Sequence, residues 1–313
     1  MARSALIAIG GNSLIRAGQR GTTTEQRANA RRTARSVVQF IAEGWQVVVT
    51  HGNGPQVGAA LLRSERASNE VYAQPLDVCV ATTQSEIGYL LQRALYDELR
   101  RAGLLMPIAT VLTEVEVASD DPAFSRPTKP IGPFYSKAAA EQKQREWGWT
   151  MLEDASRGYR RVVPSPLPLR IVQQEIIAQM VRMGILVIAL GGGGIPVVAA
   201  AQNGMEGVEA VVDKDRASSM LASALGVELL VISTDVDRVA LNFRKPDQRS
   251  LCRASAAEMR RYCSEGQFPA GSMGPKIESA LEFLGNGGKE VIITSCDKLL
   301  AAVNGSAGTH IYS

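Results

Sequence analysis

Leu6-Ile7-Ala8-Ile9-Gly10-Gly11-Asn12-Ser13 stands near the start of the chain, and in it an apolar run ends abruptly at two glycines. Such a run followed by a glycine turn is typical of a buried β-strand that leads into a loop. The same order recurs at residues 46–54 and 186–194, where an aliphatic run again ends in glycines. We therefore expect three strands of one sheet, each followed by a glycine-rich loop.

Further apolar runs of strand length alternate with helical patterns along the chain. Strands are expected at 108–112, 229–233 and 290–294, and helices at 25–43, 77–101 and 171–183. Strands that are almost wholly apolar are typical of a parallel sheet covered by helices on both faces. The pattern predicts an α/β protein with a largely parallel sheet. An apolar stripe on the helix at 171–183, expected to be buried, consists of Ile171, Val172, Ile176, Met180 and Val181.

Composition and charge argue against several classes of protein. The net charge of +3 and the absence of a Lys/Arg block disfavour a nucleic-acid partner. No apolar run approaches the roughly 18–20 residues that span a bilayer, which disfavours a membrane protein. The four cysteines are widely spaced and form no C-x-x-C pair, and there are only two histidines. A zinc site or a disulfide framework is therefore not expected, and a reducing cytoplasm fits best.

Residues 118–168 interrupt the alternation of strands and helices. Seven of the 14 prolines lie there, together with Trp147 and Trp149. A charged helix at 136–146 and two strand-like pieces follow the proline-rich loop. Long excursions from a compact domain are often functional, so we expect a small protruding subdomain that acts as a lid. A passive surface insertion is the alternative.

The glycine loops favour an anion site. Ligands of open α/β sheets bind at the carboxyl ends of the strands, and glycines let backbone N–H groups approach an oxyanion. The loops contain Gly10-Gly11-Asn12, His51-Gly52-Asn53-Gly54 and Gly191-Gly192-Gly193. Each alone could be a tight turn, but three at corresponding strand ends indicate anion binding. None has the spacing of a P-loop or of a dinucleotide-binding loop.

The two histidines have different expected roles. His51, in the second glycine loop, could be a general base or could position the loop or a ligand oxygen. If the anion site serves phosphoryl transfer to an acceptor that is already anionic, the reaction needs no strong base, and a positioning role for His51 is favoured. His310 is expected to be structural.

Three lysines stand where positive charge is otherwise unexpected. Lys214, between Asp213 and Asp215, and Lys276 each begin a predicted helix, where the helix dipole disfavours a cation. Lys129 lies between prolines in the excursion. Each could be a surface residue, but a bound phosphate would explain all three, because phosphoryl transfer depends on positioned positive charge. Asp215 could orient the ammonium groups or hold Mg²⁺ indirectly.

Long motifs along the whole chain resemble those of the carbamate kinases, in the amino-acid kinase superfamily. They include residues 8–12, 51–58, 75–79, 121–124, 127–135, 160–166, 191–196, 207–215, 234–237 and 271–276. The stretch Pro-Thr-Lys-Pro-Ile-Gly-Pro-Phe-Tyr at 127–135 separates this family from its relatives. The resemblance implies an open αβα sandwich. It also implies an N-terminal lobe (1–190, with the lid at about 118–168) for carbamate or carbamoyl phosphate, and a C-terminal lobe (191–313) for the nucleotide.

The resemblance also implies a reaction, namely reversible transfer of a phosphoryl group between carbamoyl phosphate and ADP. The products are ATP and carbamate, which decays to ammonia and carbon dioxide. It implies Mg²⁺ with ATP or ADP, and a homodimer. The implied catalytic residues are Lys129, Lys214, Asp215 and Lys276, with no direct metal ligand assigned. The implied substrate-binding residues are Gly10, Gly11, Asn12, His51, Gly52, Asn53 and Gly54, and the cofactor-binding ones are Gly191, Gly192, Gly193, Asp235, Met273 and Gly274.

Three positions depart from the usual family pattern. Ser13 stands where the family usually has Ala, Ser85 stands where many members have Gly, and Ala240 stands where Tyr is common. These departures bear on substrate preference and nucleotide affinity. The alternatives are a sister kinase for another small carboxylate or phosphonate, and a catalytically idle sensor. Arginine, agmatine and purine-derived breakdown all stay open as the pathway.

Overall fold

The computed structural model describes residues 3–16, 18–153, 158–269 and 273–313, without the side chains of Asn12 and Asn203. Its largest sheet has eight strands, in the order β15-β17-β16-β12-β1-β2-β9-β3. Their bounds are β1 Ser4–Ile9, β2 Gln46–His51, β3 Ile108–Thr110, β9 Leu186–Ala189, β12 Leu229–Thr234, β15 Arg253–Ser255, β16 Glu290–Ser295 and β17 Thr309–Tyr312. The six strands from β16 to β3 pair in parallel, and β17 runs antiparallel to β16. The prediction of a largely parallel sheet is confirmed.

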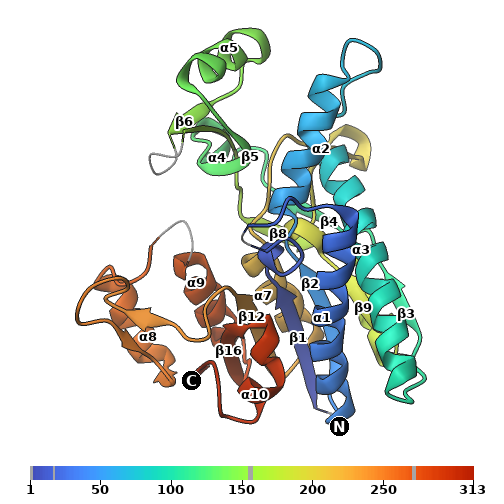
Figure 1. Ribbon diagram of the computed structural model, residues 1–313, viewed down its shortest axis with the longest axis vertical. Coiled ribbons are helices and arrows are strands. Elements are labelled where there is room, and N and C mark those ends of the chain that lie inside the picture. The colour runs from blue at the N-terminus through green and yellow to red at the C-terminus, as the bar shows by residue number, and fades with distance from the viewer. Residues whose placement is uncertain (1–2, 17, 154–157, 270–272) are drawn as a thin grey trace.

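Helices cover both faces of this sheet (Figure 1). Ala5, Ile7 and Ile9 of β1 face one apolar core, and Leu6 and Ala8 face the other, because successive side chains of a strand point to opposite faces. One core is completed by helices α1, α3 and α10, and the other by α6, α7, α8 and α9. Their bounds are α1 Thr23–Ala42, α3 Leu76–Arg101, α6 Gln174–Arg182, α7 Lys214–Leu225, α8 Ala256–Ser264, α9 Met273–Gly285 and α10 Leu299–Val303.

A smaller sheet lies beyond the strand ends, in the order β11-β10-β4-β8. Its strands are β4 Glu114–Val117, β8 Pro168–Ile171, β10 Ile195–Ala199 and β11 Met205–Gly207. A hairpin of β13 (Ala240–Leu241) and β14 (Arg249–Ser250) lies in the C-terminal part. Helix α2 (Gly54–Arg66) rises from the end of β2 toward the excursion.

The excursion forms a separate small sheet that projects above the strand ends (Figure 1). Its strands pair in the order β5-β7-β6, all antiparallel, and α5 packs against them. The elements are α4 Pro122–Ser125, β5 Lys129–Tyr135, α5 Lys137–Trp147, β6 Met151–Glu153 and β7 Tyr159–Val163. The predicted charged helix and two strands are therefore present. We keep the name lid for residues 118–168.

The helix expected at 171–183 was placed too early. Residues up to Ile171 form strand β8, and α6 begins only at Gln174. Ile171 is buried, but as part of the strand. The expected stripe is wrong at Ile176, which is 44% exposed, whereas Ile177 is fully buried. Ile171 completes β8 and Val172 lies between this strand and α6, so the apolar pair was mistaken for the first turn of a helix.

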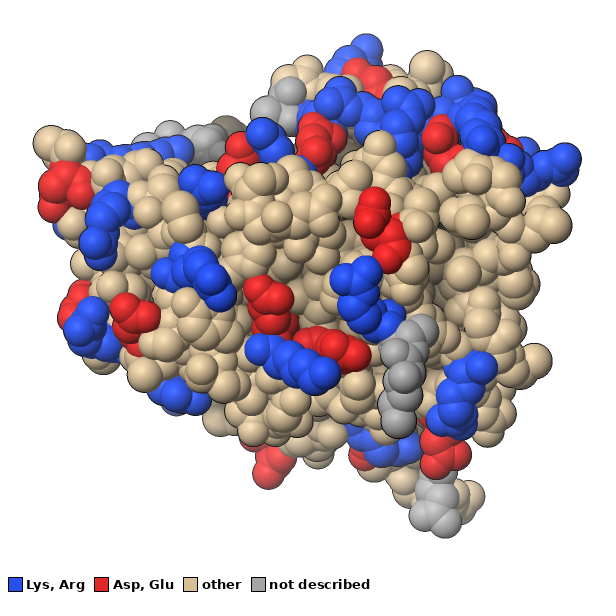
Figure 2. Space-filling view, turned by 90° about the horizontal axis from the view of Figure 1, so that it is seen from below, with Lys and Arg blue, Asp and Glu red and all other residues tan. Residues whose placement is uncertain are grey.

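The surface carries charges of both signs. Figure 2 shows Lys and Arg interspersed with Asp and Glu over one face of the molecule. Among the described residues, no helix is both long enough and apolar enough to cross a membrane.

Candidate functional site

A cleft of about 930 Å³ opens at the carboxyl ends of β1, β2 and β12, between the lid and the start of α9. This volume is in the range of small-molecule sites, roughly 300–1,000 Å³. Predicted site residues that line it are Gly10, Gly11, Gly52, Asn53, Gly54, Lys129, Gly192, Lys214, Asp215, Asp235, Met273 and Lys276. Segments far apart in the sequence thus meet at one edge of the sheet.

The first two glycine loops contact each other backbone to backbone. A Cβ atom on Gly52 would lie 2.8 Å from the backbone nitrogen of Gly11, closer than real Cβ atoms come. Only glycine at position 52 lets the two loops approach this closely, which leaves their backbone at the floor of the cleft. The side chain of Asn12, a predicted substrate contact, lies outside the described part of the chain.

The third glycine loop supports the floor from the side. Gly192 has a φ of +69°, and a Cβ atom there would overlap the side-chain amide of Asn53. The Asn53 amide in turn donates to Thr83 Oγ1 over 2.9 Å and is 3% exposed. Gly191 and Gly193 lie behind this point and are not among the residues that line the cleft. The loop therefore fixes Asn53 more directly than it meets a ligand.

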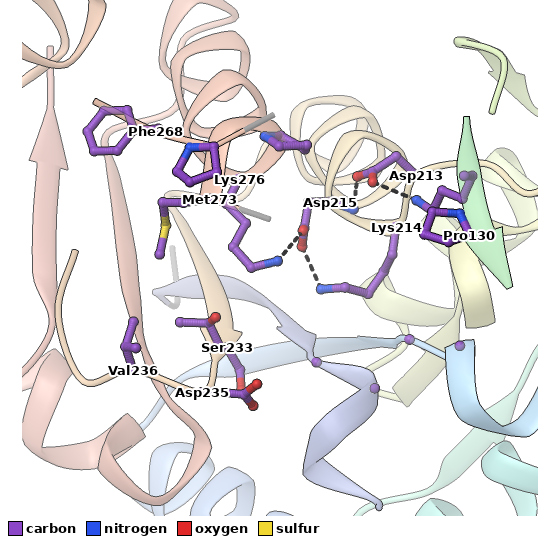
Figure 3. Close-up of a pocket in the computed structure, with 18 of the residues that line it drawn as sticks. Pro130, Asp213, Lys214, Asp215, Ser233, Asp235, Val236, Phe268, Met273 and Lys276 are labelled. Carbon is purple, nitrogen blue, oxygen red and sulfur yellow. Dashed lines mark hydrogen bonds and ion pairs between the residues drawn. The ribbon is translucent and has the colours of Figure 1, made fainter. Parts of the chain in front are cut away.

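Asp215 joins two of the three lysines. It lies in the first turn of α7 and is 4% exposed. Its Oδ1 accepts a hydrogen bond from Lys214 Nζ over 2.6 Å, and its Oδ2 accepts one from Lys276 Nζ over 2.8 Å (Figure 3). One carboxylate thus holds ammonium groups from α7 and α9 side by side, facing the cleft.

The charges of this cluster stabilise one another. Burial would raise the pKa of Asp215, but the charges and hydrogen bonds of Lys214 and Lys276 outweigh it and hold that pKa well below its usual range. Burial likewise opposes the charge of Lys276, yet Asp215 raises its pKa above the ordinary value. At Lys214 burial outweighs the charge of Asp215, and the nearby positive charge of Lys276 acts in the same direction as burial, so the pKa of Lys214 is lowered. A bound phosphate would add further negative charge beside Lys214 and favour its protonated form.

Lys129 reaches the same cleft from the lid. It is the first residue of β5, and its Nζ donates to Asp213 Oδ2 over 2.8 Å. Asp213 is the N-cap of α7, where its Oδ1 accepts from the backbone nitrogens of Asp215 and Arg216. The sequence analysis gave Asp213 no part in the site, since an Asp beside a helix start is a common cap.

His51 lies beneath the cleft and does not line it. The side chain is 1% exposed, and its Nδ1 lies 3.2 Å from the carbonyl oxygen of Gly52. Burial, together with the charge of Lys214, lowers its pKa to about 4, so the ring is neutral at pH 7. A buried neutral ring against the loop backbone fits positioning better than general-base catalysis.

His310 lies on β17 and is not among the residues that line the cleft. Its Nδ1 lies 2.6 Å from Glu290 Oε1 of β16, and its Nε2 lies 3.1 Å from the Ala307 carbonyl oxygen. The contact with Glu290 ties β17 to its antiparallel neighbour β16, as expected of a structural residue.

The other end of the cleft is more apolar. Asp235 lies after β12, opposite Met273 and Phe268 (Figure 3). Gly274 does not line the cleft, but a Cβ there would lie 3.0 Å from the Pro269 carbonyl oxygen. Cleft residues that the sequence analysis did not single out are Ser233, Val236, Arg238, Phe243, Arg244, Gln267, Phe268 and Pro269.

The loop that carries Phe243 is unusual in its backbone. Asn242 and Arg244 have positive φ angles of 52° and 64°. Residues other than glycine adopt this conformation at a cost, often beside binding sites. No sequence pattern marked this loop, because neither neighbour of Phe243 is a glycine.

No group of three or more His, Cys, Asp or Glu side chains that could hold a metal ion occurs among the described residues. Three carboxylates line the cleft: Asp213 and Asp215 are paired with lysines, and Asp235 lies toward the other end. A metal ion that acts here would therefore take most of its ligands from substrate phosphates and water.

Comparisons with known proteins give one consistent group. The model of the amino acid kinase family matches residues 4–295. A carbamate kinase of Thermococcus kodakarensis is 47% identical over 311 residues, covering 98% of each chain. The carbamate kinase-like protein YahI of Escherichia coli is 46% identical over 309 residues, also covering 98% of each. The solved structure of Giardia lamblia carbamate kinase bound to AMP-PNP has a TM-score of 0.92 at 39% identity, covering 99% of this chain and 98% of that one.

Proposed function

This chain belongs to the amino acid kinase family and, within it, to the carbamate kinases, and on this premise we propose that it transfers a phosphoryl group reversibly between carbamoyl phosphate and ADP. A β-phosphate oxygen of ADP attacks the phosphorus of carbamoyl phosphate. The bond from that phosphorus to the carbamoyl oxygen breaks, and the products are ATP and carbamate. Both reactants are already anionic where they react, so the step needs no side-chain base.

The lysine cluster is the observation that carries this proposal. A phosphoryl group in flight carries negative charge on its equatorial oxygens, and positioned cations lower the energy of that state. Lys214 and Lys276 are held by one carboxylate, and Lys129 enters from the lid. Together they can surround one phosphoryl group above the glycine loops.

The two ends of the cleft suit the two reactants. Backbone N–H groups of the loops at Gly10–Gly11 and Gly52–Gly54 suit the carbamoyl end, since they can meet an anion at close range. The end with Phe268, Met273 and Phe243 offers apolar surface for a nucleotide base. The proposed roles of Asp235 and Met273 at the nucleotide follow from this placement, and Gly274 is proposed to act beside them through its close contact with the backbone of Pro269.

We also propose that Mg²⁺ enters with the nucleotide. Mg²⁺ usually keeps several waters and is bound through one or two carboxylates and substrate phosphates. This fits a cleft in which two of the three acids are engaged by lysines, with Asp215 acting on the metal only indirectly.

A coupled assay of ATP formation from carbamoyl phosphate and Mg-ADP tests the proposed reaction. Luciferase reports ATP directly, and acetyl phosphate serves as the matched acyl phosphate. We expect ATP formation with carbamoyl phosphate to be much faster than with acetyl phosphate. No ATP from carbamoyl phosphate at any practical enzyme concentration would refute the proposed reaction.

A kinase for another small acid is the second candidate, because three positions depart from the family pattern. Of these, only Ala240 lines the cleft, and it lies toward the nucleotide end; Ser13 and Ser85 do not line it. The departures therefore bear on nucleotide binding more than on the acid. A panel of small carboxylates and phosphonates, assayed with ATP for ADP release, separates this candidate from carbamate.

We further propose a homodimer formed through α3. Val78, Tyr89 and Tyr96 are 39–57% exposed along one side of this helix, next to the edge strand β3. Exposed apolar and aromatic residues gathered on one helix face favour a protein contact. Light scattering after size-exclusion chromatography should give twice the chain mass, and Tyr89→Glu should give the single-chain mass.

Cytoplasmic localisation is also a proposal. It is supported by four cysteines that are all free, as is usual for a reducing compartment. Fractionation of the source cells, with antibody detection, tests it. Arginine breakdown is one of the pathways that a carbamate kinase reaction would suit.

A further inference from the structure

Asp213 makes contacts with two parts of the molecule at once. Its Oδ1 caps α7 by accepting the backbone N–H of Asp215 over 2.9 Å, and its Oδ2 accepts from Lys129 Nζ over 2.8 Å. The two ends of the ion pair are 84 residues apart in sequence, one on the lid and one on the body of the protein. The carboxylate thus connects the lid to the helix that carries Lys214 and Asp215.

Resting on the proposed function, we infer that Asp213 is the positioning residue for Lys129. Each of the three lysines then has a defined carboxylate: Asp215 holds Lys214 and Lys276, and Asp213 holds Lys129. The ammonium group of a lysine has three N–H donors. Lys129 can therefore keep one hydrogen bond to Asp213 and direct the other two at the transferring phosphoryl group.

Partial burial strengthens the attraction between Lys129 and Asp213. The side chains of Lys129 and Asp213 are 30% and 20% exposed, so water screens the pair only in part. Burial would raise the pKa of Asp213, but Lys129 outweighs it and holds that pKa below its usual value. Asp213 is therefore ionised at neutral pH and attracts the lid lysine before any substrate is present.

The backbone beneath Asp213 is fixed in place. A Cβ atom on Gly193 would collide with the carbonyl of Val212, and Gly193 has a φ of +96°. Val211 N donates to the Pro164 carbonyl oxygen over 2.9 Å, which ties the approach to α7 to the end of the lid. Lys129 has a flexible side chain, so the rigid partner sets its position.

Asp213→Asn separates the two roles of this side chain. Asparagine is as good an N-cap as aspartate, so α7 keeps its cap while the charge that holds Lys129 is lost. The control is Asp121→Asn, since Asp121 caps α4 and its two carboxylate oxygens accept from the backbone nitrogens of Ala123 (2.8 Å) and Leu167 (3.0 Å). Both variants lose one negative charge.

Kinetics of ATP formation give the first test. We expect Asp213→Asn to lower kcat by about tenfold or more, as for loss of a charge-assisted hydrogen bond, with the thermal midpoint unchanged. In a Lys129→Ala background the same change should have no further effect on kcat. A wild-type kcat in Asp213→Asn, or an equal loss in the Lys129→Ala background, would overturn the inference.

Hydrogen exchange gives a second test that does not depend on the reaction. Asp213→Asn should speed amide exchange in the lid strand at 129–135, and Asp121→Asn should leave that strand as in the wild type. Unchanged exchange in Asp213→Asn would overturn the inference. If the wild type makes no ATP, the proposed reaction fails, and the exchange comparison alone then decides the role of Asp213.

Discussion

Replacing Lys129 by alanine tests the part of the mechanism that depends on the lid. The change removes an ammonium group that lies in the cleft 2.8 Å from Asp213 and leaves the cluster of Lys214, Lys276 and Asp215 intact. Because Lys129 acts on the transferring group, we expect kcat to fall strongly and ADP affinity to change little.

The size of the loss follows from the charge. Two unit charges 4 Å apart interact by about 4 kcal/mol at an effective dielectric constant of 20. The Lys129 side chain is 30% exposed, so partial screening reduces this to about 2–4 kcal/mol. At about 1.4 kcal/mol for each factor of ten, kcat should fall by about 30- to 1,000-fold.

The assay couples ATP formation to luciferase, and calorimetry measures ADP binding in the absence of carbamoyl phosphate. Lys137→Ala is the matched control, because Lys137 is an exposed lysine at the start of α5 in the same lid. We expect wild-type kcat in the control. A collapse of ADP affinity in Lys129→Ala, or a kcat close to that of the wild type, would refute the assigned role.

Three further predictions concern stability. Asp215→Asn removes the carboxylate shared by two largely buried lysines and should lower the free energy of unfolding by about 3–5 kcal/mol in urea. The exposed ion pairs of Asp297 make Asp297→Asn its control, with a loss below about 1 kcal/mol. Arg244→Gly should raise the free energy of unfolding by about 0.5–1 kcal/mol, because it removes a left-handed residue with φ 64°; a loss in the same titration would contradict this. The hydrogen bond to Glu290 raises the pKa of His310 above 6.5, so its protonated form stabilises the folded state below pH 6.5. That contribution is lost as the pH rises through the raised pKa, and His310→Gln should therefore show a smaller fall in stability above pH 6.5; identical pH profiles would exclude it.

Much of the fold could be predicted because apolar runs in the sequence mark its strands. Apolar runs at 5–9, 47–49 and 186–190 end at or shortly before glycines, so both the strands and the loop positions could be recognised. The parallel arrangement then brings their carboxyl ends to one edge. The meeting of the glycine loops in one cleft follows from this arrangement.

What could not be predicted depends on contacts between distant residues or on backbone geometry. The pairing of Lys129 with Asp213 joins residues 84 apart in the sequence, one in the lid and one at the start of α7, and no local pattern encodes it. The boundary between β8 and α6 was missed because Ile171 and Val172 fit a strand and a helix equally well. The loop at Phe243 has two positive φ angles without glycine, and no turn rule marks it.

The central claim is that three ammonium groups converge on one transferring phosphoryl group. A crystal structure with Mg-ADP and aluminium fluoride, a planar mimic of that group, tests it directly. We expect Nζ of Lys129, Lys214 and Lys276 all to lie within hydrogen-bonding distance of the fluoride ligands. A closed complex in which any one of these nitrogens points away from the fluoride would contradict the account.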